Sequence, residues 1–127
     1  MPDRFLAALV TLAAITALAC SNPTELDVII GQVQIERVDV RVLDSSPPQA
    51  VAHVKGVLGD GCTELHSLDQ ERSGNVVVVT IRNQRPRDAI CTMIAKVYEA
   101  DIPLQGTYPR GEYVVKVNGV ERVFRTE

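Results

Sequence analysis

Short runs of alternating apolar and polar residues, each ended by a turn signal, constrain this chain more than any other feature. Between residues 28 and 127 the turn signals recur roughly every 8 to 14 positions, and no segment has the apolar spacing of a long helix. Alternation places one set of side chains on each face of a strand. The sequence therefore predicts an all-β domain of six to eight short strands, which is a β-sandwich or, as the alternative, a small barrel.

The first half of this region predicts three strands. Over 32–43 the apolar residues change parity at Glu36-Arg37, which predicts a bulge that turns both apolar sets toward one core. A second strand is expected over 50–58, after a turn that contains two prolines. A third strand over 62–72 is charged toward its end, as is typical of a strand at the edge of a sheet.

The next part of the chain predicts one central and one peripheral strand. Residues 76–81 form the richest β-branched run, and their continuous apolar character predicts a strand covered on both faces. Residues 82–88 are expected to form a loop. Residues 93–104 are expected to form a strand and an extended piece, and Pro103 places that piece at a sheet edge, because proline cannot donate to a ladder.

The C-terminal end predicts a hairpin. Strands over 112–117 and 120–125 flank Asn118-Gly119, which accepts the positive φ angles of a type I′ turn. Just before it, Gly111-Glu112-Tyr113-Val114-Val115 resembles the tyrosine corner of immunoglobulin-like domains, in which the phenol bonds to upstream backbone. This resemblance implies an immunoglobulin-like antiparallel sandwich of about seven strands, which follows an N-terminal helical signal segment.

The first twenty residues predict an export signal. The uncharged run over 5–19 would make a helix of roughly 22 Å, which is shorter than the roughly 30 Å core of a bilayer. Ala17-Leu18-Ala19 before Cys20 resembles the lipobox of bacterial lipoproteins, which implies cleavage between Ala19 and Cys20 and lipidation of Cys20. The expected layout is a lipoprotein signal peptide (1–19), a lipidated cysteine with its tether (20–31) and a β-sandwich (32–127).

Two other interpretations of this segment stay open. The same residues fit ordinary signal peptidase, which would give a soluble secreted protein, and an uncleaved anchor is the third interpretation. The cysteine count favours lipidation, because Cys62 and Cys91 are expected to form a disulfide after export and the odd cysteine, Cys20, then carries the lipid. The chain resembles small bacterial lipoproteins of unassigned activity. That resemblance implies the exported side of the bacterial cell envelope, and the outer membrane if the host has one.

Composition and motifs argue against several classes of function. The net charge is −3, only 4 % of the residues are aromatic and none is tryptophan, so nucleic acid is not an expected partner. His53 and His66 form no zinc pattern with the cysteines, so no metal or other cofactor is expected. No serine nucleophile motif occurs, and Glu64 and His66 are expected to share a solvated face. The sequence therefore predicts a protein that is not an enzyme.

One local concentration of positive charge predicts a place for binding. Arg82, Arg85 and Arg87, with Arg72 expected nearby across the hairpin, suit a loop that grips a carboxylate or phosphate. The neighbouring turn over 59–61 is expected to contribute. We therefore expect a membrane-anchored envelope lipoprotein with a non-catalytic binding sandwich, whose partner is another envelope or surface protein. The alternative is an inhibitor of an exported protease that presents Arg85-Pro86-Arg87 to the active site.

Overall fold

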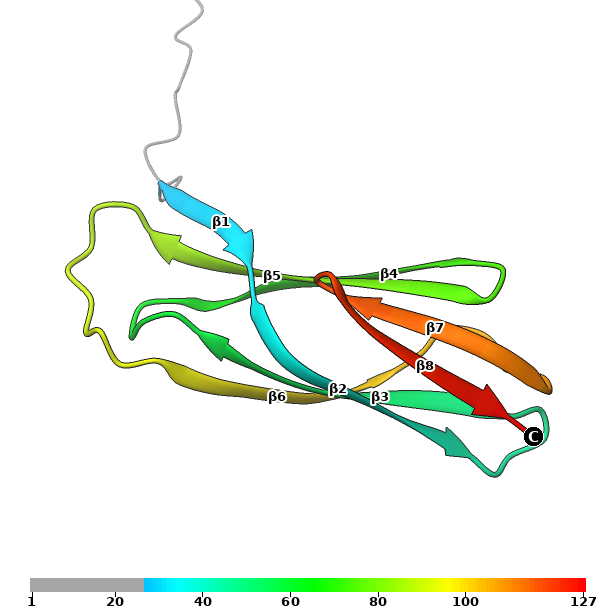
Figure 1. Ribbon diagram of the computed structural model, residues 1–127. Coiled ribbons are helices and arrows are strands. Elements are labelled where there is room, and N and C mark those ends of the chain that lie inside the picture. The colour runs from blue at the N-terminus through cyan, green and yellow to red at the C-terminus, as the bar shows by residue number, and fades with distance from the viewer. Residues whose placement is uncertain (1–26) are drawn as a thin grey trace, which may run out of the picture.

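Two β-sheets packed face to face make up the protein in a computed structural model that describes residues 27–127 (Figure 1). The larger sheet contains β1 (Val28–Gln32), β4 (Glu64–Ser73), β5 (Val76–Pro86), β7 (Gly111–Val117) and β8 (Val120–Thr126). The smaller sheet contains β2 (Gln34–Leu43), β3 (Gln49–Leu58) and β6 (Lys96–Pro103). The predicted all-β sandwich is confirmed, and residues 27–127 contain eight strands rather than about seven. The expected helical signal segment lies outside the described residues, as do Ala19 and Cys20.

The longest strand, β5, organises the larger sheet. Along one edge it pairs with β4, and its opposite edge is divided between two strands. β1 pairs with its last residues, from Arg82 to Pro86, and β7 pairs in parallel with its first residues, from Val76 to Val79. The strictly antiparallel arrangement that we expected is therefore wrong at this pair. The chain returns from β6 at the far end of the sandwich, so β7 runs in the same direction as β5 (Figure 1).

Asn118 closes the gap that remains between β1 and β7 on the edge of β5. Its Oδ1 accepts a hydrogen bond from the Ile81 N–H (2.9 Å), and its Nδ2 donates to the carbonyls of Ile81 (2.9 Å) and Val33 (2.7 Å). The side chain thus completes the ladder where no strand reaches, since buried backbone groups need partners. Asn118 and Gly119 have φ angles of 47° and 86°, so the predicted turn is confirmed.

The core lies between the sheets and follows the predicted alternation. Val33, Ile35 and Val38 of the first predicted strand are all buried, because the register shifts between Ile35 and Arg37. The predicted bulge at Glu36 is therefore confirmed. Gly56 lies opposite this bulge, and a Cβ atom there would approach the Gln34 carbonyl oxygen to 2.4 Å. The close approach of β2 and β3 thus depends on a glycine at this position.

An aromatic cluster fills the end of the core near the C-terminus. The rings of Tyr108, Tyr113 and Phe124 have centroids 5.0–5.6 Å apart, and the Arg72 guanidinium lies 4.2 Å from the Tyr108 ring centre. The Tyr113 hydroxyl donates to the Pro109 carbonyl, so the predicted bond from this phenol to upstream backbone is confirmed. Arg72 therefore lies in this cluster. The expectation that it would lie near the other arginines is wrong.

Two expectations about β5 are corrected. Its residues Arg82 to Pro86 are strand rather than loop, because β1 and β4 supply hydrogen-bonding partners for them. The strand is covered on one face only, since Val77 and Val79 are buried while Val78 is exposed. Its position between paired neighbours accounts for the β-branched run, because that composition suits any well-paired strand.

Two predicted boundaries also differ from those in the structure. The sandwich begins at Val28 rather than at residue 32, since β1 pairs with β5. The segment expected to form a strand from Met93 instead becomes regular only at Lys96, and β6 continues to Pro103. β6 lies at an edge of the smaller sheet, as Pro103 predicted, and β4 lies at the edge of the larger one.

Asn118→Gly should separate the two functions of this asparagine. Glycine keeps the positive φ angle but removes the three side-chain hydrogen bonds, so we expect the free energy of unfolding to fall by about 2–3 kcal/mol. Urea unfolding followed by circular dichroism measures the change. Gly119→Ala is the comparison, because it strains the turn and keeps the bonds. A value for Asn118→Gly within error of the wild type would contradict the role of Asn118 in the sheet.

Candidate functional site

Two connections between the sheets meet at one end of the sandwich. The turn from β3 to β4 and the segment 87–95 from β5 to β6 each pass from one sheet to the other there (Figure 1). The disulfide between Cys62 and Cys91 joins them, with the two Cα atoms 5.5 Å apart. The predicted disulfide is confirmed, and it fixes the position of segment 87–95, which we call the end loop.

Asp60 organises the turn beneath the end loop. Its Oδ1 accepts hydrogen bonds from the Cys62 N–H (3.0 Å), the Thr63 N–H (2.9 Å) and the Thr63 hydroxyl (2.8 Å). The Thr63 hydroxyl is the largest cause of a lowered pKa for this carboxyl group; burial opposes the shift, and the Cys62 N–H and Arg85 add to it. Asp60 is therefore held as a carboxylate that shapes the turn.

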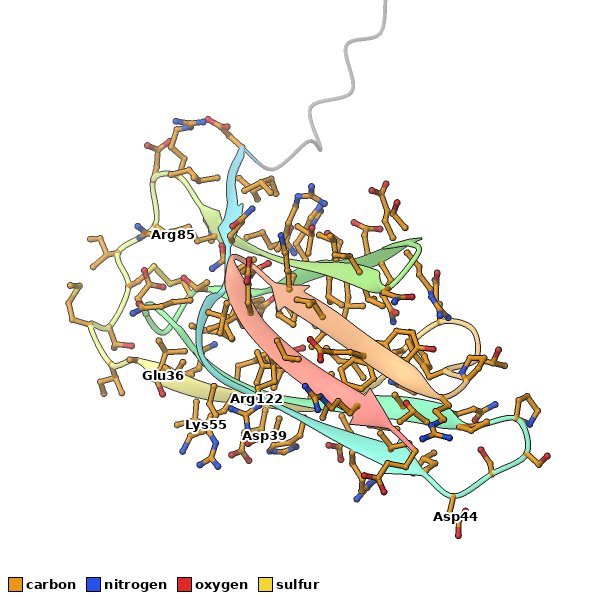
Figure 2. All side chains as sticks on the ribbon, turned by 45° about the vertical axis from the view of Figure 1, so that its right-hand side comes forward. Glu36, Asp39, Asp44, Lys55, Arg85 and Arg122 are labelled. Atoms are coloured by element: carbon orange, nitrogen blue, oxygen red, sulfur yellow. A yellow bond between two sulfur atoms is a disulfide. The ribbon has the colours of Figure 1, made fainter. Side chains whose placement is uncertain are left out.

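Arg85 reaches this cluster because of its position in β5. It shares the parity of Val77, Val79 and Ile81, so its side chain points toward the space between the sheets. There the core ends, and Arg85 Nε lies 3.3 Å from Asp60 Oδ2 while Nη2 lies 3.6 Å from Cys91 Sγ. Figure 2 shows Arg85 at this end of the molecule. The predicted proximity of the arginine region and the turn at 59–61 is thus present in the structure.

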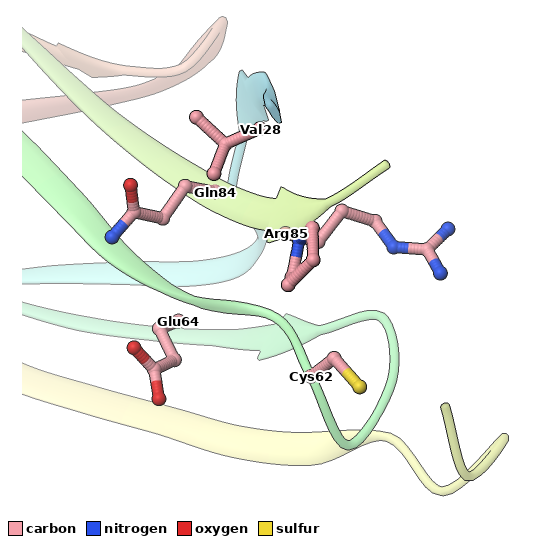
Figure 3. Close-up of a pocket in the computed structure, with 6 residues that line it drawn as sticks. Val28, Cys62, Glu64, Gln84 and Arg85 are labelled. Atoms are coloured by element: carbon pink, nitrogen blue, oxygen red, sulfur yellow. The ribbon is translucent and has the colours of Figure 1, made fainter. Parts of the chain in front are cut away.

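A surface depression of about 320 Å³ lies beside this cluster. Figure 3 shows its walls, with residues of β1 and β5 on one side and residues of the β3–β4 connection and β4 on the other. It is lined by Val28, Cys62, Glu64, Gln84, Arg85 and Pro86. The lining contains two charged groups, the ion-paired guanidinium of Arg85 and the carboxylate of Glu64, and its other residues are apolar or uncharged.

The three arginines predicted to lie in one binding loop do not share a loop. Arg82 Nη1 lies 2.9 Å from Asp69 Oδ2, and Arg87 Nε lies 2.9 Å from Asp27 Oδ2. Together with the Arg85 pair, these contacts give each guanidinium its own carboxylate. Arg82 and Arg85 belong to β5, and only Arg87 lies in the connection that follows. The expected patch of unpaired positive charge is therefore absent among the described residues.

The end loop carries a feature that the sequence interpretation missed. Ile90 is fully exposed, and Met93 and Ile94 are 90 % and 71 % exposed. Met93 and Ile94 resemble the start of an apolar strand, and the sequence interpretation therefore places them in one. The signal that identifies this segment as a loop is Cys91, because its disulfide attaches the segment to the β3–β4 turn. The Gly61 N–H also donates to the Thr92 carbonyl (2.9 Å), so a backbone hydrogen bond and the disulfide both attach the end loop to the β3–β4 turn.

Metal binding and acid–base chemistry find little support at this end. Ligand atoms of Asp60, Cys62 and Cys91 lie within 4.8 Å of one another, but the disulfide leaves no thiolate to bind an ion. His53 is exposed on the smaller sheet and pairs with Asp101 at 2.7 Å, while His66 is exposed on β4.

In the region from Asp27 to Glu127 no helix is long and apolar enough to cross a membrane.

Removing the disulfide should destabilise the protein and release the end loop. The double variant Cys62→Ser, Cys91→Ser should lose about 3.5 kcal/mol of unfolding free energy, from closure of the loop that the bridge spans. Urea unfolding gives this value, and hydrogen exchange of residues 87–95 should accelerate. Thiol labelling of the wild-type protein provides the control. Labelling of both Cys62 and Cys91 would contradict the pairing.

Asp60 should make stability depend on pH in the acid range. Its pKa in the folded protein lies below the ordinary value of 3.8, so its contribution is present above that value and is lost as pH falls through the folded pKa. Asp60→Asn should therefore lower stability at pH 7 and flatten the decline below about pH 4. Denaturation measured from pH 7 to pH 2 tests this. The matched control is Asp44→Asn, at the opposite end (Figure 2), and an equally flattened decline in that variant would contradict the assignment.

Comparisons with known proteins give this chain a family. The model of a family described as the ORF11 beta-sandwich domain matches residues 52–126, from β3 through β8. An uncharacterised 10.2 kDa protein of the HgiCIIM 5′ region of Herpetosiphon aurantiacus is 33 % identical over 93 residues, which are 73 % of this chain and 99 % of the relative. Another, of the HgiBIM 5′ region, is 33 % identical over 81 residues, which are 64 % of this chain and 99 % of that protein. No solved structure matches. Since the family model covers more than half of the sequence, the chain belongs to the ORF11 beta-sandwich domain family.

Proposed function

We propose that this protein is a lipoprotein of the bacterial cell envelope, cleaved between Ala19 and Cys20 and lipidated on Cys20. The observation that supports this most is the pairing of Cys62 with Cys91, because it leaves Cys20 as the remaining one of three cysteines. A thioether to lipid at the lipobox gives that thiol a use after export. The domain then stays on the exported side, at the outer membrane if the host has one.

We further propose that the tethered sandwich acts by binding and not by catalysis. The charged groups at the end of the sandwich have partners within the protein, because Arg85 forms an ion pair with Asp60 and the turn donates hydrogen bonds to the Asp60 carboxylate. What this end offers outward is mainly the apolar surface of the end loop. Exposed apolar surface of this kind marks contact with a partner. The location offers this surface two occupants, another envelope or surface protein and the bilayer itself.

An immunoglobulin-like arrangement of the sandwich is part of the same proposal. It is supported by the bond from the Tyr113 hydroxyl to the Pro109 carbonyl, which is the contact expected of a tyrosine corner. The parallel pairing of β7 with β5 is the departure from a purely antiparallel sandwich.

Inhibition of an exported protease remains the alternative function. It requires Arg85-Pro86-Arg87 to project into an active-site cleft. In this fold Arg85 and Pro86 end β5, and Asp60 and Asp27 engage the two guanidinium groups. The binding proposal therefore has the better geometric support.

Cys20→Ser tests the lipid anchor directly. The full chain is expressed in a bacterial host, cells are fractionated, and the mature N-terminus is determined by mass spectrometry. We expect wild-type protein in the membrane fraction, starting at an acylated Cys20, and a Cys20→Ser protein that is either released or left unprocessed, because the thiol that carries the lipid is gone.

Ser21→Ala is the control for this experiment, since it changes the next residue and keeps the thiol. It should behave as wild type. A wild-type chain whose first mature residue is unmodified would contradict the proposal, and so would processing and membrane retention of Cys20→Ser equal to wild type.

A further inference from the structure

Exposed apolar side chains are distributed unevenly over the sandwich. Of the ten large apolar side chains that residues 27–127 leave exposed, seven lie at or beside the end that carries the end loop. Three of them, Ile90, Met93 and Ile94, belong to the loop itself. The other four stand beside it, where strands begin: Ile29 and Ile30 of β1, Leu65 of β4 and Val97 of β6. A concentration of apolar surface at one end indicates a surface that is covered in the working protein.

The end loop cannot hide these side chains against the core. Ile90 precedes Cys91 and Met93 follows Thr92, so the apolar residues flank the two positions that are fastened to the β3–β4 turn. At Gly61 a Cβ atom would lie 2.1 Å from Thr92 Oγ1, which shows how closely the turn and the loop approach. The fastening turns the loop's apolar side chains outward, to solvent or to whatever covers them.

The tether enters the sandwich at the same end. Asp27, the residue before β1, is bound to the end loop twice, because Arg87 Nε lies 2.9 Å from its carboxylate and the Arg87 N–H donates to its carbonyl (3.0 Å). Asp27 is seven positions after Cys20 in the sequence, and seven fully extended steps span at most about 25 Å. A lipid on Cys20 therefore keeps this end within about 25 Å of the bilayer surface.

We propose that the end loop dips into the membrane interface and that Ile90, Met93 and Ile94 bury their side chains among the lipids. This inference rests on the lipid anchor proposed above. Apolar side chains at an interface enter roughly 5–10 Å below the headgroups, which is within reach of a projecting loop. The acyl chains then hold the protein, and the loop fixes its orientation, with the C-terminal end of the sandwich directed away from the bilayer.

The absence of tryptophan makes this proposal directly testable. In the mature lipidated protein, M93W introduces one fluorescent reporter into the end loop, and V123W introduces one on exposed β8 away from it. Both proteins are reconstituted in phosphatidylcholine vesicles with and without brominated acyl chains, which quench tryptophan only on contact. We expect M93W emission to shift to the blue and to fall at least roughly twofold with brominated lipid, as burial at interface depth requires. V123W emission should not change.

Several outcomes would overturn the proposal, and they can be told apart. M93W protein that floats with the vesicles but is not quenched removes the loop insertion and leaves the lipid anchor intact. A blue shift without quenching shows that a second protein copy covers the loop, and it also overturns the proposal. Protein that carries no lipid and fails to float contradicts the proposed function itself, and this inference falls with it. I90W, on the other side of Cys91, repeats the measurement if circular dichroism shows that M93W does not fold.

Discussion

The shared edge of β5 is the constraint on which the rest of this fold depends. One strand pairs with β4 from Val76 to Gln84 and with β1 and β7 in succession on the other side. Two strands that meet end to end leave backbone groups without partners at their junction, and the Asn118 side chain supplies those partners at Ile81. A hairpin turn thereby joins three strands that are far apart in the sequence. This one amide bridges the junction between β1 and β7 on the edge of β5.

The same strand also places the chemistry at the end of the sandwich. Side chains of β5 that point inward are apolar as far as Ile81, and the next inward positions are Asn83 and Arg85. The strand therefore changes from core to polar cap as it leaves the space between the sheets. Arg85 meets Asp60 there, and Asp60 in turn shapes the β3–β4 connection that the disulfide fastens to the end loop.

Local patterns in the sequence predicted local features well. Asn118-Gly119 predicted its turn, the parity change predicted the bulge at Glu36, and the cysteine count together with the expectation of export predicted the pairing of Cys62 with Cys91. Each of these depends on a few neighbouring residues or on a count. The sequence also predicted that β4 and β6 lie at edges, from charge in one and proline in the other.

Features that depend on distant partners could not be predicted in this way. β1 has exposed Ile29 and Ile30, so it shows no alternation, and only its pairing with β5 makes it a strand. Without β1, residues Arg82 to Pro86 had no partner on that edge and were assigned to a loop. The carboxylates that pair with Arg82, Arg85 and Arg87 come from three separate segments of the chain. These ion pairs could therefore not be predicted from the sequence around the arginines.

The place where β1 begins has a mechanical consequence. β1 runs antiparallel to β5, and Asp27 just before it is bound to Arg87 just after β5. Pulling the chain outward along the axis of β1 loads all of the hydrogen bonds between these two strands at once, in shear, rather than opening them one after another. The domain therefore resists unfolding when force is applied to its N-terminal end, because that force is shared by all of the hydrogen bonds of one strand pair.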